Sequence, residues 1–285
     1  MLSASPLEWS DWKPLQSPKE IAAPNKSGLY RIRDAQTHSV LYLGETGAKA
    51  GLAGRLSHLR TCFRDEMPYA DPHTAGPALW AHLKDGFGPL EVSIAIFEGT
   101  KQQRRAIESS EISKLRCENG ASPMASFGRM PVGWTKSSGN SQHLVDSGKR
   151  FRGNRTSNTS SPPSEPCRLD LIRNPIDVDW AELKWSKWTI EIPSTRFLGI
   201  YRIRETGEHS LLYIGEGYVS TRLKAHRRKN LDPTHPQHEF FSRDIEFSWI
   251  ATPGLESVQR KEIENDLIAS HNHTIGFCPL AQFLG

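Results

Sequence analysis

The feature that most constrains the fold of this chain is an internal duplication. Residues 28–45 and 199–216 align without a gap, and 11 of these 18 positions are identical in the two copies. Shared segments also lie upstream, at residues 7–12 and 183–188, where each copy has a pair of tryptophans. The repeat distance of roughly 155–175 residues is far longer than the roughly 20–50 residues of a solenoid repeat. The sequence therefore predicts two copies of one domain.

The length of the chain sets the domain organisation. A chain of 285 residues is long enough for two domains that each bury a core. We predict a first domain at residues 1–130, a connector at residues 131–168 that is basic and rich in serine and proline, and a second domain at residues 169–285. Within the connector, residues 156–166 have the Ser, Thr, Asn and Pro composition that is typical of a flexible linker.

Each copy is predicted to be a small α+β domain. In the second copy, the alternating pattern after Gly199 predicts a strand, and a turn at Thr206-Gly207 leads to a second strand from Leu211 to Ile214. The parallel segments 90–93 and 245–248 predict a third strand. We therefore expect a roughly three-stranded antiparallel sheet flanked by helices in each copy, with the tryptophan pairs as core residues that close the sheet.

A helix that could carry functional residues is predicted from Ser220 to Leu231, because this segment begins with residues that can cap a helix and has no internal proline or glycine. On this helix Arg222 and His226 are i, i+4 neighbours and share a face. The two strands contribute Tyr201 and Tyr213. We expect two phenols, a guanidinium and an imidazole to converge on one patch.

These residues resemble the motif of the GIY-YIG nuclease family. The second copy has Gly199-Ile200-Tyr201 and, after eleven residues, Tyr213-Ile214-Gly215, and the first copy has Gly28-Leu29-Tyr30 and Tyr42-Leu43-Gly44. The Arg-x-x-x-His helix and a late glutamate, Glu264, extend the likeness. The resemblance covers residues 26–127 and 197–283. It implies tandem nuclease domains, similar in motif to restriction-type members, that hydrolyse phosphodiester bonds of DNA with Mg²⁺ or Mn²⁺.

The resemblance also implies a role for each residue of the second copy. Glu264 would hold the divalent cation, a Lewis acid, and Arg222 would neutralise the scissile phosphate with its permanent charge. Tyr201 would lie near the attacking water as general base or relay, while Tyr213 positions the phosphate. His226, whose ordinary pKa lies near neutrality, could share the proton transfer.

The first copy retains most of this set. Tyr30, Tyr42, Arg55 and Glu108 occupy the corresponding positions, and Glu108 is a second candidate metal ligand. The residue four positions after Arg55 is Leu59, so the first copy lacks the imidazole. The first copy is therefore either a second, altered site or a DNA-reading module.

The choice of metal ligand and the position of the family's asparagine are not decided by the sequence. Glu262 and Asp266 are carboxylates that compete with Glu264 for the metal, and a solvated helix face is the alternative for both. The asparagine that the family places downstream of its glutamate is Gly120 in the first copy and Gly276 in the second. Both copies thus depart from the family pattern at this position.

The formal net charge of +4 permits a polyanionic partner without proving one. We predict contacts with the phosphate backbone of double-stranded DNA, which act by counterion release. The candidate residues are Arg129, Lys136, Lys149, Arg150, Arg152, Arg227, Arg228 and Lys229. For the tract at residues 129–155, a solvated connector is an equally weighted alternative.

No apolar run approaches the roughly 18 residues of a membrane span, and the N-terminus does not resemble a signal peptide. We predict a cytoplasmic protein with no membrane partner, as a monomer or homodimer. Restriction or defence is the first functional choice, because no helicase or separate DNA-binding module accompanies the motif. The alternatives are a structure-specific DNA repair nuclease, and a nucleic-acid-binding protein with decayed catalysis in one or both copies.

Overall fold

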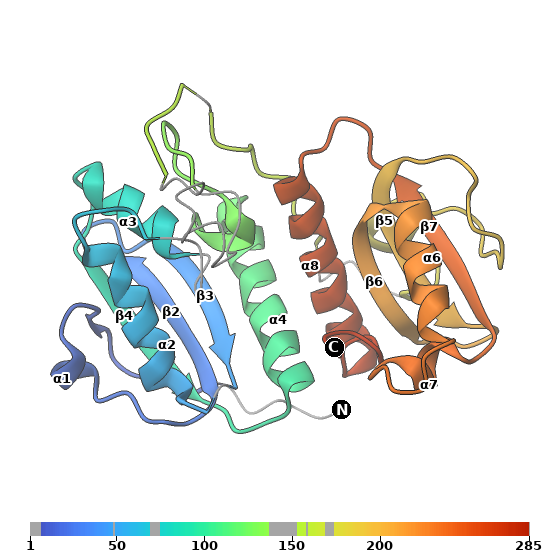
Figure 1. The fold of residues 1–285 in the computed structure, drawn as a ribbon, viewed down its shortest axis with the longest axis horizontal. Helices are drawn as coiled ribbons and strands as arrows, with labels where there is room; N and C mark the ends of the chain where they lie inside the picture. Colours follow the sequence, from blue (N-terminus) through green and yellow to red (C-terminus); the bar gives the residue numbers. More distant parts are fainter. Residues whose placement is uncertain are drawn as a thin grey trace. The chain divides into compact units, whose positions relative to one another are not determined.

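The computed structural model describes residues 7–47, 49–68, 75–136, 153–157, 159–168 and 174–284. Over these residues the chain has a mixed α+β fold with two antiparallel sheets, one of four strands and one of three (Figure 1). The predicted α+β class with antiparallel sheets is confirmed. In the part of the chain that is described, no helix is long and apolar enough to cross a membrane.

The described residues group into two compact units that we name after their sheets. The four-stranded unit comprises residues 4–100 and 123–162, and the three-stranded unit comprises residues 101–122 and 163–285. This division does not follow the predicted boundaries at residues 130 and 168. Helix α4 (Lys101–Asn119), which belongs to the first sequence repeat, groups with the three-stranded unit because it packs on helix α8 (Ser257–Ile275).

The four-stranded unit has the strand order β1-β4-β2-β3, and each neighbouring pair is antiparallel. The two-residue strand β1, which lies beside β4, was not predicted. The elements in chain order are β1 (Lys13–Pro14), α1 (Pro18–Ile21), β2 (Gly28–Asp34), β3 (Val40–Thr46), α2 (Gly51–Leu59), the 3₁₀ turn η1 (Arg60–Phe63), α3 (Gly76–Lys84), β4 (Leu90–Ile96) and the 3₁₀ turn η2 (Ser126–Gly128).

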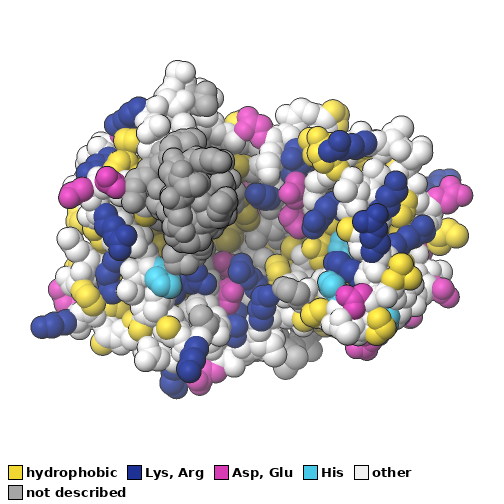
Figure 2. Space-filling model, viewed as in Figure 1, with side chains coloured by type: hydrophobic (Ala, Val, Ile, Leu, Met, Phe, Trp, Pro, Cys, Tyr) yellow, Lys and Arg dark blue, Asp and Glu magenta, His cyan; other side chains and the backbone are white. Residues whose placement is uncertain are grey.

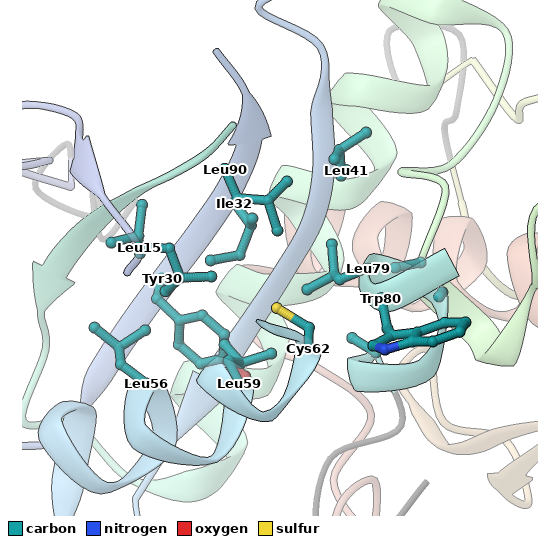
Figure 3. Close-up of a cluster of buried hydrophobic side chains, with 14 of the residues drawn as sticks. Leu15, Tyr30, Ile32, Leu41, Leu56, Leu59, Cys62, Leu79, Trp80 and Leu90 are labelled. Carbon is teal, nitrogen blue, oxygen red and sulfur yellow. The ribbon is translucent and has the colours of Figure 1, made fainter. Parts of the chain in front are cut away.

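The core of this unit lies between the sheet and its helices. Tyr30 and Ile32, two positions apart on β2, project from the same face, since side chains alternate along a strand. They enter an apolar cluster with Leu56 and Leu59 of α2 and Trp80 of α3 (Figure 3). The first motif tyrosine is therefore a core residue of the four-stranded unit.

The three-stranded unit has the strand order β6-β5-β7, again with antiparallel neighbours. All three predicted strands are present and longer than predicted. Besides α4 and α8, the elements are β5 (Leu198–Glu205), β6 (Leu211–Tyr218), α6 (Val219–Lys229), α7 (His238–Phe241) and β7 (Ile245–Ala251). The predicted helix is thus α6, but its N-cap is Tyr218 without a side-chain cap, so the prediction of a serine or threonine cap was wrong.

The two hairpins share their register in detail. In β2–β3 the Cα of Tyr30 pairs with that of Gly44, and in β5–β6 the Cα of Tyr201 pairs with that of Gly215. The register shifts by one residue at the same place in both, after Ile32 and after Ile203. A shared bulge at equivalent positions indicates that the sequence duplication extends to the backbone.

A buried ionic cluster joins α4 to α8 in the three-stranded unit. Arg116 lies 3.0 Å from both Asp266 and Glu262, and all three side chains are fully buried. The backbone N–H of Ser164 donates to Glu262 at 2.7 Å, and that of Cys167 donates to Asp266 at 3.1 Å. The flexible-linker prediction is therefore wrong for the segment around residue 164, which is held by charge-assisted hydrogen bonds.

Each tryptophan pair packs against an arginine of its own sheet, Arg31 on β2 or Arg202 on β5. The Arg202 guanidinium lies 4.2 Å from the Trp185 ring centroid and 4.6 Å from that of Trp188. Arg31 lies 4.4 Å from Trp9 and 4.7 Å from Trp12 in the same way. Of the four indoles, Trp185 is buried and the others are part-exposed. The prediction of core residues is confirmed for Trp185, which is buried in an apolar cluster with Trp188 packed against it. The cation–π stacks that these rings also form were not predicted.

Candidate functional site

A glycine opposite the first motif tyrosine makes room for its ring. A Cβ atom at Gly215 would lie 2.3 Å from the Tyr201 hydroxyl oxygen, and one at Gly44 would lie 2.5 Å from the Tyr30 hydroxyl oxygen. Non-bonded atoms cannot approach so closely, so a larger residue would displace the tyrosine. The spacing between the two parts of the motif therefore has a packing reason in both copies.

Three predicted site residues meet at the hydroxyl of Tyr201. Nε2 of His226 lies 3.0 Å from the Tyr201 oxygen, and Nε of Arg222 donates to the same oxygen at a longer 3.4 Å. Both partners come from one face of α6, as their i, i+4 spacing predicts. Tyr201 and His226 are buried, whereas Arg222 is exposed. The arginine is thus the member of this group that solvent and a substrate can reach.

The second motif tyrosine packs against the same group. The Tyr213 ring stacks on Tyr201 with centroids 6.2 Å apart, and it lies 4.4 Å from the His226 ring. Burial raises the pKa of both phenols above the ordinary 10, although the charge of Arg222 opposes this shift. Both tyrosines are therefore protonated at neutral pH in the resting protein.

The imidazole of His226 is held from its other side by a lysine. The Lys229 ammonium lies 3.1 Å from His226 Nδ1 and also donates to the side-chain oxygen of Gln237. Burial, followed by the charges of Lys229 and Arg222, lowers the pKa of His226 to about 2, so this imidazole is neutral. Burial and then Arg222 lower the pKa of Lys229 to about 8.

Glu264 comes to this group from α8. Its charge is coupled to Tyr213 and Arg222, and its side chain is part-exposed. Among the described residues, none makes a hydrogen bond or ion pair with its carboxylate. Burial, and then the neighbouring charge of Glu216, raises the pKa of Glu264 to about 8, while Arg222 and Lys261 oppose the shift.

The competing carboxylates have other partners. Glu262 and Asp266 are fully buried in the cluster with Arg116, so neither lies on the solvated helix face that was the alternative for them. Glu216, from β6, is bound by Arg260 at 2.9 Å. Of the three acidic candidates on α8, Glu264 is the one that remains without an ionic partner among the residues described.

Glu264 could give a divalent cation one carboxylate ligand. Within the described ranges, no group of three or more His, Cys, Asp or Glu side chains is placed to hold a metal ion. Mg²⁺ commonly takes one or two protein carboxylates and completes its shell with water and substrate phosphates. A part-exposed carboxylate without a partner, whose pKa is raised by burial and by a second carboxylate, is a donor that a cation would stabilise.

The candidates of the first copy are divided between the two units. Tyr30 and Tyr42 lie together in the four-stranded unit, with ring centroids 6.0 Å apart and planes tilted by 38°. Arg55 is part-buried on α2, and Leu59, which replaces the imidazole, is fully buried in the core. Glu108 lies on α4, in the three-stranded unit, and is buried.

Two of the predicted phosphate-contacting residues are exposed on α6. These are Arg227 and Arg228, and Figure 2 shows Lys and Arg side chains gathered over the region of α6. Arg227 also donates to the backbone carbonyl of Ile190. Lys229, on the same helix, turns its ammonium toward His226 and Gln237 instead. The prediction of a phosphate contact for Lys229 is therefore at odds with its contacts.

The described candidates in the basic tract at residues 129–155 are poorly exposed for contact with DNA. Arg129 is 7% exposed, and the Lys136 ammonium donates to the Gly128 carbonyl at 2.7 Å. Neither side chain is presented openly to solvent. Lys149, Arg150 and Arg152 lie outside the described residues, so their assignment stays a prediction.

Two residues near the imidazole were not predicted in these roles. Lys229 was not expected to contact His226, and Gln237, which accepts from Lys229, was not singled out at all. The i, i+3 spacing of His226 and Lys229 on one helix was a usable signal. Gln237 lies beyond the end of α6 in an irregular segment, and no local pattern connects it to the site.

A scan against protein-family models found no matching family, and searches of curated proteins and of solved structures found no match to this chain. The geometry of the site and the resemblance of its motif are therefore the two grounds for a function.

Proposed function

We propose that this protein is a divalent-metal-dependent DNA endonuclease that hydrolyses phosphodiester bonds at a site in its second copy. The observation that supports this most is that five side chains, including the phenol of Tyr201, come together in one group. They come from two strands and two helices, and they are Tyr201, Tyr213, Arg222, His226 and Glu264. The resemblance to the GIY-YIG motif supports the same reaction class.

The exposed members of the site would contact the phosphodiester. Arg222 presents a permanently charged guanidinium that can donate to the non-bridging oxygens. Tyr213 is part-exposed and can position the same group. Glu264 would hold the cation, whose positive charge would offset the negative charge that develops on the phosphate oxygens. These three side chains would contact the substrate, and the buried pair, Tyr201 and His226, packs behind them.

The buried pair would handle proton movement. Tyr201 is fully buried and protonated in the resting protein, so a role as relay fits it better than a role as preformed general base. His226 is neutral, and both of its ring nitrogens are engaged, by Tyr201 and by Lys229. In this proposal His226 orients the phenol and takes no proton from water.

The biological role and the number of working sites also belong to the proposal. Restriction or defence remains the first choice and structure-specific repair the second. The chain would bind double-stranded DNA, would be cytoplasmic, and would act as a monomer or homodimer. Because the first copy has Leu59 in place of the imidazole, a nucleic-acid-binding role with decayed catalysis is the alternative for that copy.

Replacement of Glu264 tests the proposal. Glu264→Gln is expected to slow cleavage by about 10³-fold in Mg²⁺, because cation binding contributes several kcal/mol to the stabilisation of charge. DNA affinity should change little. Thermal stability should be equal or higher, since the change removes a part-buried carboxylate without an ionic partner. Cleavage rate, DNA binding and melting temperature are measured on the same preparations.

Glu239→Gln is the matched control, because Glu239 is exposed and its contact with Arg243 at 3.5 Å is a surface ion pair. It should cleave at the wild-type rate. If Glu264→Gln cleaves as fast as this control, the assignment of the site is wrong. If the wild type binds DNA but cuts nothing in Mg²⁺ or Mn²⁺, the DNA-binding alternative is favoured.

A further inference from the structure

The contact between Lys229 and His226 has a fixed direction. A lysine ammonium has three hydrogen-bond donors and no acceptor. Its 3.1 Å contact therefore requires Nδ1 of His226 to be the acceptor. Because this imidazole is neutral, its one proton must then lie on Nε2. Nε2 is the nitrogen that faces the Tyr201 oxygen at 3.0 Å.

The Tyr201 oxygen consequently receives two donors. His226 donates from Nε2, and Arg222 donates from Nε, which carries a proton at every accessible pH. The hydroxyl proton of Tyr201 must then point in the remaining direction. In the opposite tautomer, Nε2 of His226 would accept the hydroxyl proton of Tyr201 and hold it in the interior. The tautomer of His226 thus decides whether the Tyr201 hydroxyl donates its proton to Nε2 or directs it elsewhere.

The lysine is itself held in place. Gln237 is buried, and its amide nitrogen donates to the Ala281 carbonyl at 2.6 Å, which turns its oxygen toward the Lys229 ammonium. The same ammonium lies 5.1 Å from the Phe241 ring centroid and 5.7 Å from that of Tyr213, within cation–π range. These contacts orient Lys229 toward the site, whereas a residue that only contacts a DNA backbone needs none of them.

We propose that Lys229 is a positioning residue that places the His226 proton on Nε2 and so aims two donors at the Tyr201 oxygen. The effect of Lys229 on catalysis rests on the proposed nuclease function. The placement of the His226 proton by Lys229 is independent of that function. Loss of Lys229 frees His226 to take either tautomer, and the Tyr201 hydroxyl then donates a hydrogen bond to Nε2 in part of the molecules.

The test compares Lys229→Met with Lys224→Met. Both changes remove one positive charge from α6, but Lys224 is exposed and lies outside the contacts described above. The ¹⁵N chemical shifts of the His226 ring report directly which nitrogen carries the proton. In the wild type and in Lys224→Met, Nε2 should be protonated and Nδ1 unprotonated. In Lys229→Met, the shifts should move toward a mixture of the two tautomers.

Cleavage kinetics give the second readout. Lys229→Met should lower the single-turnover rate about 10- to 100-fold, as is typical for the loss of a partner that orients a reacting group. Its affinity for DNA should match that of Lys224→Met. A wild-type imidazole protonated on Nδ1, or an unchanged tautomer in Lys229→Met, overturns the proposal. The proposal is also overturned if Lys229→Met weakens DNA binding and reduces its dependence on salt concentration, because these changes indicate a phosphate contact.

The two failures are distinguishable. If the protein cleaves no DNA but His226 changes its tautomer in Lys229→Met alone, the nuclease function falls and the positioning by Lys229 stands. If the protein cleaves DNA but Lys229→Met leaves the His226 tautomer unchanged, the nuclease function stands and the positioning role of Lys229 is wrong. The wild-type spectrum suffices to decide against the proposal even if Lys229→Met does not fold.

Discussion

Replacing Tyr201 by phenylalanine is expected to lower the single-turnover rate of DNA cleavage by about 10²-fold or more, the usual range for the loss of a group that moves a proton. The change removes the oxygen that accepts from Arg222 Nε and His226 Nε2. It also leaves a buried imidazole N–H without an acceptor, which costs about 1–3 kcal/mol. The rate should therefore be measured well below the melting temperature of the variant.

Tyr218→Phe is the matched control, because Tyr218 ends the strand that also carries Tyr213. Its ring is exposed and lies 3.8 Å beneath the Arg196 guanidinium, and no hydrogen bond of its hydroxyl is recorded within the described residues. Removing this hydroxyl should leave the cleavage rate unchanged. Equal rates for the two variants would contradict the role assigned to Tyr201, as would a defect that is explained entirely by lost folding.

The largest expected effect on stability comes from Arg116. Arg116→Leu should destabilise the protein by about 3–5 kcal/mol, because it leaves Glu262 and Asp266 buried without their cation. Burial already raises the pKa of Asp266 above its ordinary value, even with Arg116 beside it. The loss should appear as a lower denaturant midpoint in chemical unfolding.

Lys114→Met provides the comparison on the same helix. Lys114 forms an exposed ion pair with Glu111 at 2.7 Å, and such pairs contribute at most about 1 kcal/mol. If Arg116→Leu costs no more than Lys114→Met, the buried cluster does not hold α4 against α8 as described. Replacing all three members of the cluster by apolar residues should be far less costly than the single change.

Local pattern was sufficient to predict the strands and the helix that build the site. The alternation after Gly199 and the turn at Thr206-Gly207 are short-range signals, and β5, β6 and α6 follow them closely. The i, i+4 spacing of Arg222 and His226 placed both on one face of α6, and both reach the same phenol. Each of these predictions depended on residues that are neighbours in the sequence.

The predictions that failed concern contacts between distant segments. Trp185 and Trp188 pack in an apolar core as expected, but apolar periodicity could not reveal that Arg202 stacks on their rings. A composition of Ser, Thr and Pro suggested flexibility around Ser164, yet this segment docks on Glu262, almost a hundred residues away. Polar side chains in a buried network carry no local signature, because their burial depends on partners brought together by the fold.

The same limit applies to Lys229. Its position among basic residues of α6 suggested a phosphate contact, and the acceptors that draw it inward, His226 and Gln237, become apparent only in three dimensions. Conversely, the sequence left three carboxylates of α8 in competition for the cation. The partners of Glu262 and Asp266 in the structure leave Glu264 as the remaining candidate.

Metal-dependent DNA cleavage is tested with supercoiled plasmid and the wild-type protein in Mg²⁺, with a chelator as the reference. We expect cut DNA in Mg²⁺ and intact plasmid with the chelator. Nicked circles would indicate one working site, and linear DNA would indicate two, supplied either by the first copy with Glu108 or by the second chain of a homodimer. Plasmid that is bound by the protein but stays intact in both Mg²⁺ and Mn²⁺ would contradict the account.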